Sequence, residues 1–379
     1  MSMSRQAGIL LPGYNPLLVA NAPTIGTATS ASGTSVSVTF TAPSCTGGSV
    51  ISTYSAYCTT TGTNRVTGAS SPIVVTGLTT GQAYTFRVIA TNIYGPSYPS
   101  GASNSVTPIA QGQQAYTTAG TYSWVVPAGV TSVSVLTVGG GGGGGGSSGG
   151  TCTGGSGGGG GSLAYVNNLS VTPAETLTVI VGASGTTGGA GNCGTIGGDS
   201  KFSRSSTALT WAYGGNRGRV CGSSTAARSS APCGVSQTYY AGGGASATSY
   251  IGSGGGGAGG YAGTGGTGNT GSGVAGAGGG GGGGGVSTAN MGSGGGGVGI
   301  LGQGSNGSAP SGGGSCGAGG SGGAYPSGGG AGGAFGGGGG GASGGWSSGI
   351  AGGNGAVGAV RIIWPGNTRS FPSTNTGNL

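Results

Sequence analysis

The chain has 379 residues, of which 107 are glycine and only 3% are charged. With no histidine and two acidic residues, it offers neither an imidazole base nor a carboxylate pair for glycoside cleavage, so we expect no enzyme. The net charge of +8 rests on ten cations in 379 residues, a density too low to predict nucleic-acid binding.

Residues 1–21 form an N-terminal segment ahead of the first predicted strand. The segment carries one arginine, Arg5, and Pro12 interrupts its apolar run, so it is a poor match to a signal peptide. No stretch of the chain approaches the length of a membrane span. We therefore expect a protein that is neither exported by the usual route nor anchored in lipid.

Residues 22–108 predict a small β-sandwich. Apolar and polar residues form strand-like stretches at 35–43, 49–58, 71–78 and 83–92, separated by turn-forming Gly, Pro, Ser and Thr. Strands at such short, regular intervals are typical of an all-β sandwich.

The run LTTGQAYTFRVIATNIYGPS (78–97) resembles the fibronectin type III domain. The resemblance implies that Tyr84 is a corner tyrosine, whose hydroxyl bonds to upstream backbone, and that Phe86, Val88 and Ala90 point inward. Phe40 stands where this family commonly has tryptophan. Such domains are mostly spacers or display modules, and we expect a spacer here, with no RGD triplet to suggest integrin binding.

Residues 109–115 are predicted to be a linker, residues 116–366 a glycine-rich domain, and residues 367–379 a C-terminal tail. The glycine-rich domain begins and ends with strand-like sequence, which predicts a sheet or sandwich as its base. Its strand-like stretches lie at 115–138, 162–171, 175–182, 206–215 and 355–364.

Eight consecutive glycines (139–146) follow Val138 directly, and further tracts occur at 278–285 and 336–341. A flexible linker as long as the glycine-rich sequence between residues 215 and 355 is uncommon inside one domain. In the polyproline-II conformation the chain has three residues per turn and leaves its N–H and C=O groups for lateral hydrogen bonds. Because only glycine lets backbones approach so closely, we predict a mainly β fold whose sheet base carries a bundle of polyglycine-II helices.

The seven cysteines include no Cys-x-x-Cys pair, and the chain has no histidine. We therefore predict no metal site and no cofactor. Cys221 and Cys233 bracket an arginine-containing loop and could form a disulfide, but free thiols fit the sequence equally well.

The motif GTYSWVVPAGVTSVSVLTVGGGGGGG (120–145), the glycine tracts and the closing GNGAVGAVRIIWPG (353–366) resemble glycine-rich virion proteins of tailed bacteriophages. The segments SRQAGILLPGYNP (4–16) and NTRSFPSTNTG (367–377) look like parts of cyanophage structural proteins. Related tail-fibre adhesins pack polyglycine-II helices into a sandwich and present variable loops at its far end.

This resemblance implies a tail fibre or adhesin that is assembled in the host cytoplasm and exposed on the virion. Residues 1–21 would bind other virion proteins, and loops of the glycine-rich domain would bind a host envelope glycan or outer-membrane component. We expect a homo-oligomer and no nucleic acid among the partners. The alternatives are a capsid decoration or head-fibre protein, and a non-viral glycine-rich structural or ice-binding protein.

Candidate receptor-binding residues are the aromatic side chains within the glycine-rich sequence and three arginines near Cys221 and Cys233. Aromatic rings offer contact area at little entropic cost, and arginine binds phosphate and carboxylate. The alternative is that the rings cover the flanks of the bundle or pack its base, and that the arginines lie on a solvated loop. The candidates are Tyr239, Tyr240, Tyr250, Tyr261, Tyr325, Phe335, Trp346, Arg217, Arg219 and Arg228.

Overall fold

The structure is a computed structural model with two compact units, Met1–Gln111 and Gly112–Leu379. Each unit is built from β-strands, as expected for a mainly β protein, and no α-helix occurs among the described residues. Nothing in this part of the chain could cross a membrane as a helix. The described residues are 18–60, 62–148, 154–220, 236–245, 252–270, 273–277, 280–281, 284, 292–303, 306, 329–342 and 350–372.

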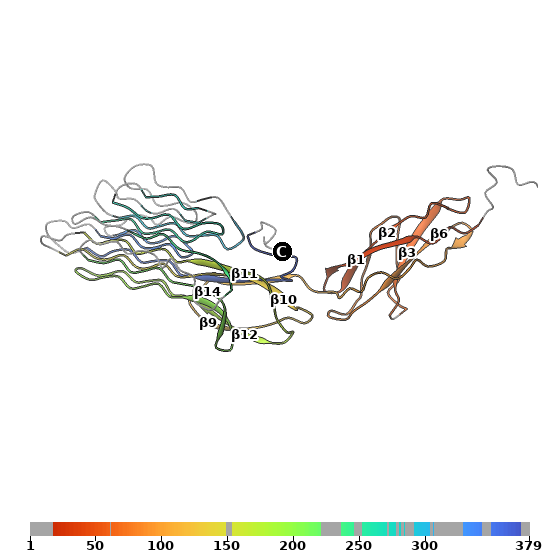
Figure 1. Cartoon of the computed structure of the whole chain (residues 1–379), viewed down its shortest axis with the longest axis horizontal. Coiled ribbons are helices and arrows are strands. Elements are labelled where there is room, and N and C mark those ends of the chain that lie inside the picture. Colours follow the sequence, from red (N-terminus) through yellow and green to blue (C-terminus); the bar gives the residue numbers. More distant parts are fainter. Residues whose placement is uncertain are drawn as a thin grey trace, which may run out of the picture. The chain divides into compact units, whose positions relative to one another are not determined.

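The first unit is a sandwich of two antiparallel sheets (Figure 1). One sheet has the order β1-β2-β5, with strands Thr24–Ser32 (β1), Ser35–Thr41 (β2) and Ile73–Val75 (β5). The other has the order β4-β3-β6-β7, with strands Ile51–Cys58 (β3), Val66–Gly68 (β4), Phe86–Asn92 (β6) and Gly95–Pro96 (β7).

The core of the first unit follows the predicted alternation. Phe86, Val88 and Ala90 on β6 are fully buried, as expected. The hydroxyl of Tyr84 accepts a hydrogen bond from the backbone N–H of Thr79 at 3.0 Å, which confirms the predicted corner tyrosine.

Three serines follow β7 at intervals of three residues and lie along β6. The Ser100 hydroxyl accepts the N–H of Val88 at 2.9 Å, while the N–H of Ser100 donates to the Val88 carbonyl, also at 2.9 Å. Ser97 and Ser103 make the same pair of bonds to Ala90 and Phe86. The three hydroxyls thus take the place of the carbonyls that a neighbouring strand would offer. They provide acceptors for the N–H groups of alternate residues of β6, namely Phe86, Val88 and Ala90.

The second unit contains two further antiparallel sheets. The five-stranded sheet has the order β15-β11-β10-β16-β8, with strands Gly112–Tyr116 (β8), Ser132–Val138 (β10), Leu163–Ser170 (β11), Thr238–Tyr240 (β15) and Ala359–Trp364 (β16). The four-stranded sheet has the order β14-β13-β12-β9, with strands Gly120–Val125 (β9), Thr176–Val181 (β12), Ser200–Arg204 (β13) and Thr207–Ala212 (β14).

Glycine-rich segments connect these strands and run side by side as long extended stretches (Figure 1). Residues 139–147 lead away from β10, and residues 154–162 lead back to β11. Residues 182–198 leave β12 and return to β13 in the same way. The segments therefore have one end at the sheets and another end, called here the far end, where the chain reverses.

The N–H groups of residues 139–147 donate to three neighbouring segments in rotation. Gly140 donates to the carbonyl of Gly198 at 2.9 Å. Three residues later, Gly143 donates to the carbonyl of Thr195 at 3.0 Å. Each neighbour thus receives every third N–H and runs antiparallel to the central segment. The three neighbours are 156–162, 192–198 and 350–356.

The carbonyl groups of the same segment accept from three other neighbours, which run parallel to it. Gly185 donates to the carbonyl of Gly141, and Gly188 donates to that of Gly144, both at 2.8 Å. The segment 139–147 is therefore hydrogen-bonded on all sides and is buried up to Ser147. The three parallel neighbours are 185–191, 215–218 and 339–342.

Glycine is required in this segment because the neighbouring backbones leave no room for a side chain. A Cβ added at Gly143 would overlap the carbonyl of Thr186, and one at Gly146 would overlap that of Gly189. At Gly144 the overlap is with a different neighbour, at Gly340. The obstructing backbone changes at each residue and returns at every third, with the same rotation as the hydrogen bonds.

The predicted boundaries of this unit differ from the structure at both ends. Residues 112–115, expected in a linker, belong to β8, which pairs with β16. Residues 367–372, expected in a tail, pack on the base: Phe371 is buried and exchanges two hydrogen bonds with the side chain of Asn167, at 2.6 and 2.9 Å. Arg369, also buried, donates to the carbonyl of Gly112.

Candidate binding surface

Tyr261, expected at a receptor-binding loop, is instead a core residue. Its side chain is fully buried, and its ring stacks on Phe371 with centroids 6.0 Å apart. Its hydroxyl donates to the carbonyl of Gly299 at 3.0 Å, and burial raises the pKa of this hydroxyl. The expectation fails because a glycine-rich sequence gives no periodicity that separates a buried aromatic residue from an exposed one.

Tyr240 and Phe335 pack against the same core cluster as Tyr261. Tyr240 lies on β15, opposite Leu163 in the five-stranded sheet. Both residues therefore help to pack the base of the glycine segments, which was the alternative to receptor binding. Four further candidates lie outside the described residues: Tyr250, Tyr325, Trp346 and Arg228.

Arg217 and Arg219 are exposed, and Tyr239 is half-exposed. Both arginines lie on the glycine-rich segment that leaves β14, whereas Tyr239 lies on β15. The loop that was expected to hold Arg217 and Arg219 is thus, in its described part, a hydrogen-bonded segment. Its Gly215 and Gly218 donate to the central segment 139–147.

Two aromatic residues that sequence reasoning missed lie next to Tyr239. Trp211 and Tyr213 have ring centroids 5.3 Å apart, and Tyr213 and Tyr239 meet edge to face at 6.4 Å. All three rings are half-exposed. The alternation in LTWAY (209–213) is the signal that could have found them, because it places Trp211 and Tyr213 on one face of a strand.

The chain's single lysine and one of its two acidic residues surround Trp211. The ammonium of Lys201 lies 3.7 Å from the centre of the Trp211 ring and 4.0 Å from Asp199 Oδ2. Asp199 accepts the indole N–H of Trp211 and the backbone N–H of Gly214, both at 3.0 Å. These contacts hold the Trp211 ring and fix the point at which β14 becomes a glycine segment.

A glutamine joins the row of rings to the strand beside it. The side chain of Gln237 accepts the backbone N–H of Trp211 and donates to its carbonyl, both at 2.7 Å. Gln237 immediately precedes β15, so these bonds place Tyr239 against Tyr213. We call the five half-exposed or exposed residues Trp211, Tyr213, Arg217, Arg219 and Tyr239 the aromatic–arginine flank.

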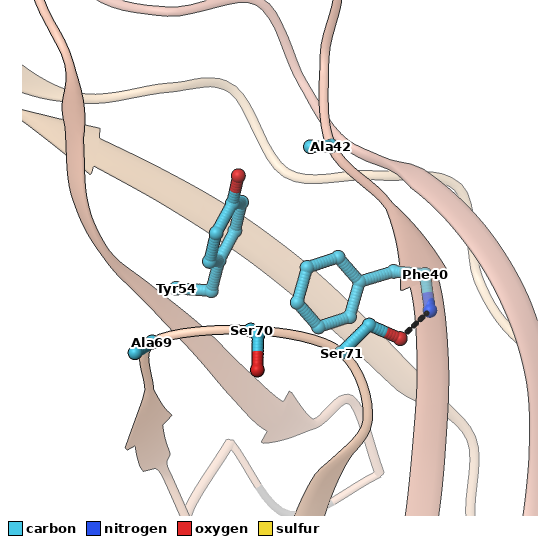
Figure 2. Close-up of a pocket in the computed structure, with 6 residues that line it drawn as sticks. All are labelled: Phe40, Ala42, Tyr54, Ala69, Ser70 and Ser71. Carbon is cyan, nitrogen blue, oxygen red and sulfur yellow. Dashed lines mark hydrogen bonds between the residues drawn. The ribbon is translucent and has the colours of Figure 1, made fainter.

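The first unit has a small open cavity of about 180 Å³ (Figure 2). Phe40 and Tyr54 lie side by side in it, with ring centroids 4.7 Å apart, and Ser71 accepts the N–H of Phe40 at 2.9 Å. Both rings are more than nine-tenths buried. A cavity of this size is smaller than most ligand pockets, so we assign no site to it.

The described residues contain no group of three His, Cys, Asp or Glu side chains that could hold a metal ion. Cys45 and Cys193 are exposed free thiols. Cys221 and Cys233, whose pairing the sequence left open, lie outside the described residues.

Comparison with protein families identifies both units. The family model described as "Glycine-rich domain" matches residues 117–365. The model of the fibronectin type III domain matches residues 21–106, in agreement with the resemblance at 78–97. No curated protein matches the chain.

Among solved structures, domains A168–A170 of titin match with 31% identity over 24% of this chain and 32% of the titin chain, at a TM-score of 0.22. The titin kinase with its flanking domains matches with 31% identity over 24% and 17%, at 0.21. The twitchin kinase region of C. elegans matches with 23% identity over 25% and 18%, at 0.22. This chain therefore spans about a third or less of these structures.

Proposed function

The chain belongs to the glycine-rich domain family, and we propose that it is a non-enzymatic structural protein of a phage virion, of the tail-fibre or adhesin kind. In this proposal residues 1–21 attach the protein to other virion proteins, and the fibronectin type III domain is a spacer. The glycine-rich unit presents the surfaces that bind the host envelope.

The observation that carries the proposal is the hydrogen-bonded packing around residues 139–147. Every third N–H or carbonyl goes to the same neighbour, which is the rotation of a helix with three residues per turn. We propose that these segments are polyglycine-II helices and that they form a rigid bundle on the two sheets. We expect the chain reversals at the far end of such a bundle to tolerate variation, because the packed segments hold one another through their own backbone hydrogen bonds.

The composition supports a passive carrier rather than an enzyme. Of the two acidic residues in the sequence, Glu175 pairs with Arg204, and Asp199 binds the Trp211 indole. Both carboxylates therefore have structural partners, and the chain has no histidine to act as a general base.

The position on a virion is tested by immunogold labelling of purified particles with antibodies against the full chain. Label at the tail supports the proposal. Label on the head favours the capsid-decoration alternative, and no label on any particle contradicts a virion role.

The role of the N-terminal segment is tested separately, by deletion of residues 1–21. The truncated protein is expected to remain folded, because the strands of the first unit begin at Thr24. It should be less stable, because the deletion removes the buried Ala20 and the hydrogen bonds that Leu18 makes with Gly47 and with the Asn92 side chain. Its incorporation into virions should be lost. Particles that still carry the truncated chain would refute attachment through this segment.

A further inference from the structure

We propose that the aromatic–arginine flank binds a linear acidic oligosaccharide. The inference rests on the proposed function only for its biological setting, because the binding itself is a property of the purified chain. It places a binding surface along the side of the glycine segments, beginning at β14 and β15 and extending to Arg219, rather than on the chain reversals at the far end.

The aromatic part of the flank supplies surface for stacking. Trp211, Tyr213 and Tyr239 form a continuous row with centroid separations of 5.3 and 6.4 Å, and each ring is half-exposed. Aromatic rings combine a flat apolar face with a polar edge, which suits the apolar face and hydroxyl rim of a sugar ring. The rings are held in place before binding, so little side-chain entropy is lost.

The charge of the flank selects an acidic ligand. Arg217 and Arg219 are exposed and lie within eight residues of Trp211 along the same segment. The acidic residue in this region, Asp199, accepts hydrogen bonds from Trp211 and Gly214 and lies 4.0 Å from Lys201. In a chain with 3% charged residues, this concentration of cations gives the flank a local positive potential. Arginine forms strong paired hydrogen bonds with carboxylate, sulfate and phosphate.

The geometry of the segment favours a linear ligand over a compact one. The carbonyls of Tyr213, Asn216 and Arg219 accept hydrogen bonds from one neighbour, residues 156–162. Three-residue spacing repeats every ~9 Å along such a segment. Tyr213, Asn216 and Arg219 therefore follow one another in a straight row that begins at the aromatic rings and runs toward the far end. Arg217 lies at the edge of this row, because its position is turned by about a third of a revolution from that of Arg219.

The binding test uses the full-length protein and three probes in calorimetric titration: a galacturonic acid hexamer, maltohexaose and polyglutamate of similar charge. The acidic hexamer is expected to bind, maltohexaose to bind more weakly, and polyglutamate to bind least. Tight binding of polyglutamate with no preference for the sugar acid would contradict the proposal, because it would show that charge alone is recognised. The absence of hexamer binding would also overturn it.

Variants assign the binding to the flank. Replacing both arginines (Arg217→Ala with Arg219→Ala) should weaken hexamer binding at least about tenfold, because charge-assisted hydrogen bonds are lost. Tyr239→Ala should weaken binding of both sugars about threefold to tenfold through lost stacking. The matched controls are Arg65→Ala and Tyr98→Ala in the fibronectin type III domain, where both side chains are exposed. These should leave binding unchanged.

A thermal unfolding curve for each variant shows that the fold is retained. If the flank variants and the control variants lost hexamer binding to the same extent, the assignment of binding to the flank would be overturned. The two proposals can fail independently. Flank-dependent hexamer binding without label on any virion refutes the virion role alone, whereas labelled virions without hexamer binding refute the oligosaccharide site alone.

Discussion

At the scale of single residues, the two units satisfy backbone N–H groups in two different ways. In one a glycine lets another backbone approach, and in the other a serine hydroxyl acts as the acceptor. In the glycine-rich unit, the missing side chain of Gly143 lets the Thr186 backbone come into contact. In the fibronectin type III domain, the hydroxyl of Ser100 reaches the N–H of Val88, where an edge strand would offer a carbonyl. An unpaired buried N–H costs about 1–3 kcal/mol, so both devices matter to stability.

Gly143→Ala is expected to destabilise the glycine-rich unit by roughly 1–3 kcal/mol or more, because the added methyl group overlaps backbone that cannot move alone. The matched control is Gly189→Ala, where the nearest atom to an added Cβ is the side-chain nitrogen of Asn192, 4.0 Å away. Thermal unfolding of both variants measures the difference. Equal melting temperatures would contradict the packing described here.

Ser100→Ala should cost about 1–3 kcal/mol of unfolding free energy, because it leaves the buried N–H of Val88 without its acceptor. Ser105→Ala is the control, since the Ser105 side chain is exposed. Urea unfolding of the two variants provides the comparison. A neutral Ser100→Ala would mean that the Val88 N–H has found another acceptor.

At the scale of elements, alternation and glycine content predict much of the fold, and pairing decides the rest. The strands around Phe86 and Val135 follow from alternating apolar residues. The strand β8 was missed because its sequence GQQAY contains little apolar surface; its pairing with β16 makes it a strand. Packing of Phe371 against Tyr261 joins residues far apart in sequence and could not be read from local pattern.

The candidate site was predictable to a smaller extent. Arg217 and Arg219 were identified as arginines near Cys221 and Cys233 that could bind an anionic group, and both are exposed. Trp211 was overlooked although the alternation in LTWAY (209–213) could have found it. Tyr261 was misassigned because exposure in glycine-rich sequence depends on which segments lie alongside. That information resides in hydrogen bonds between distant glycines rather than in side-chain periodicity.

Amide hydrogen exchange tests the packing of the glycine segments directly. The N–H groups of residues 139–147 all donate to backbone carbonyls and are buried, so their exchange should be slowed to a degree comparable with β10. The N–H of Thr270, which bonds to the exposed side chain of Asn269, should exchange much faster. Rapid exchange throughout 139–147 would show that these segments are not packed in solution.

At the scale of the whole molecule, the absence of histidine and the presence of only two acidic residues predict a stability that changes little with pH between about 5 and 7. The hydrogen bond from Arg204 lowers the pKa of the Glu175 carboxyl from its ordinary value of 4.5. The stabilisation is therefore fully present above pH 4.5 and is lost as the pH falls through the lowered pKa. With no histidine in the chain, we expect a flat profile from about pH 5 to 7.

Urea unfolding at neutral pH and at about pH 3 measures this loss. The variant Glu175→Gln should be less stable than the natural chain at neutral pH and should lose less on acidification. A larger acid-induced loss in Glu175→Gln would contradict the assignment of the pH dependence to this ion pair.

The rotation of hydrogen bonds around residues 139–147 also limits how such a chain can change in length. One extra residue inside a segment would turn everything after it by about a third of a revolution and direct side chains at neighbouring backbones. Three extra residues would return each later side chain to its original direction and would only lengthen the segment. Insertions and deletions within the segments should therefore be tolerated in multiples of three, while the far-end reversals accept any number. Related proteins should therefore differ freely in the lengths of their far-end reversals, whereas the lengths of their glycine segments should differ by multiples of three residues.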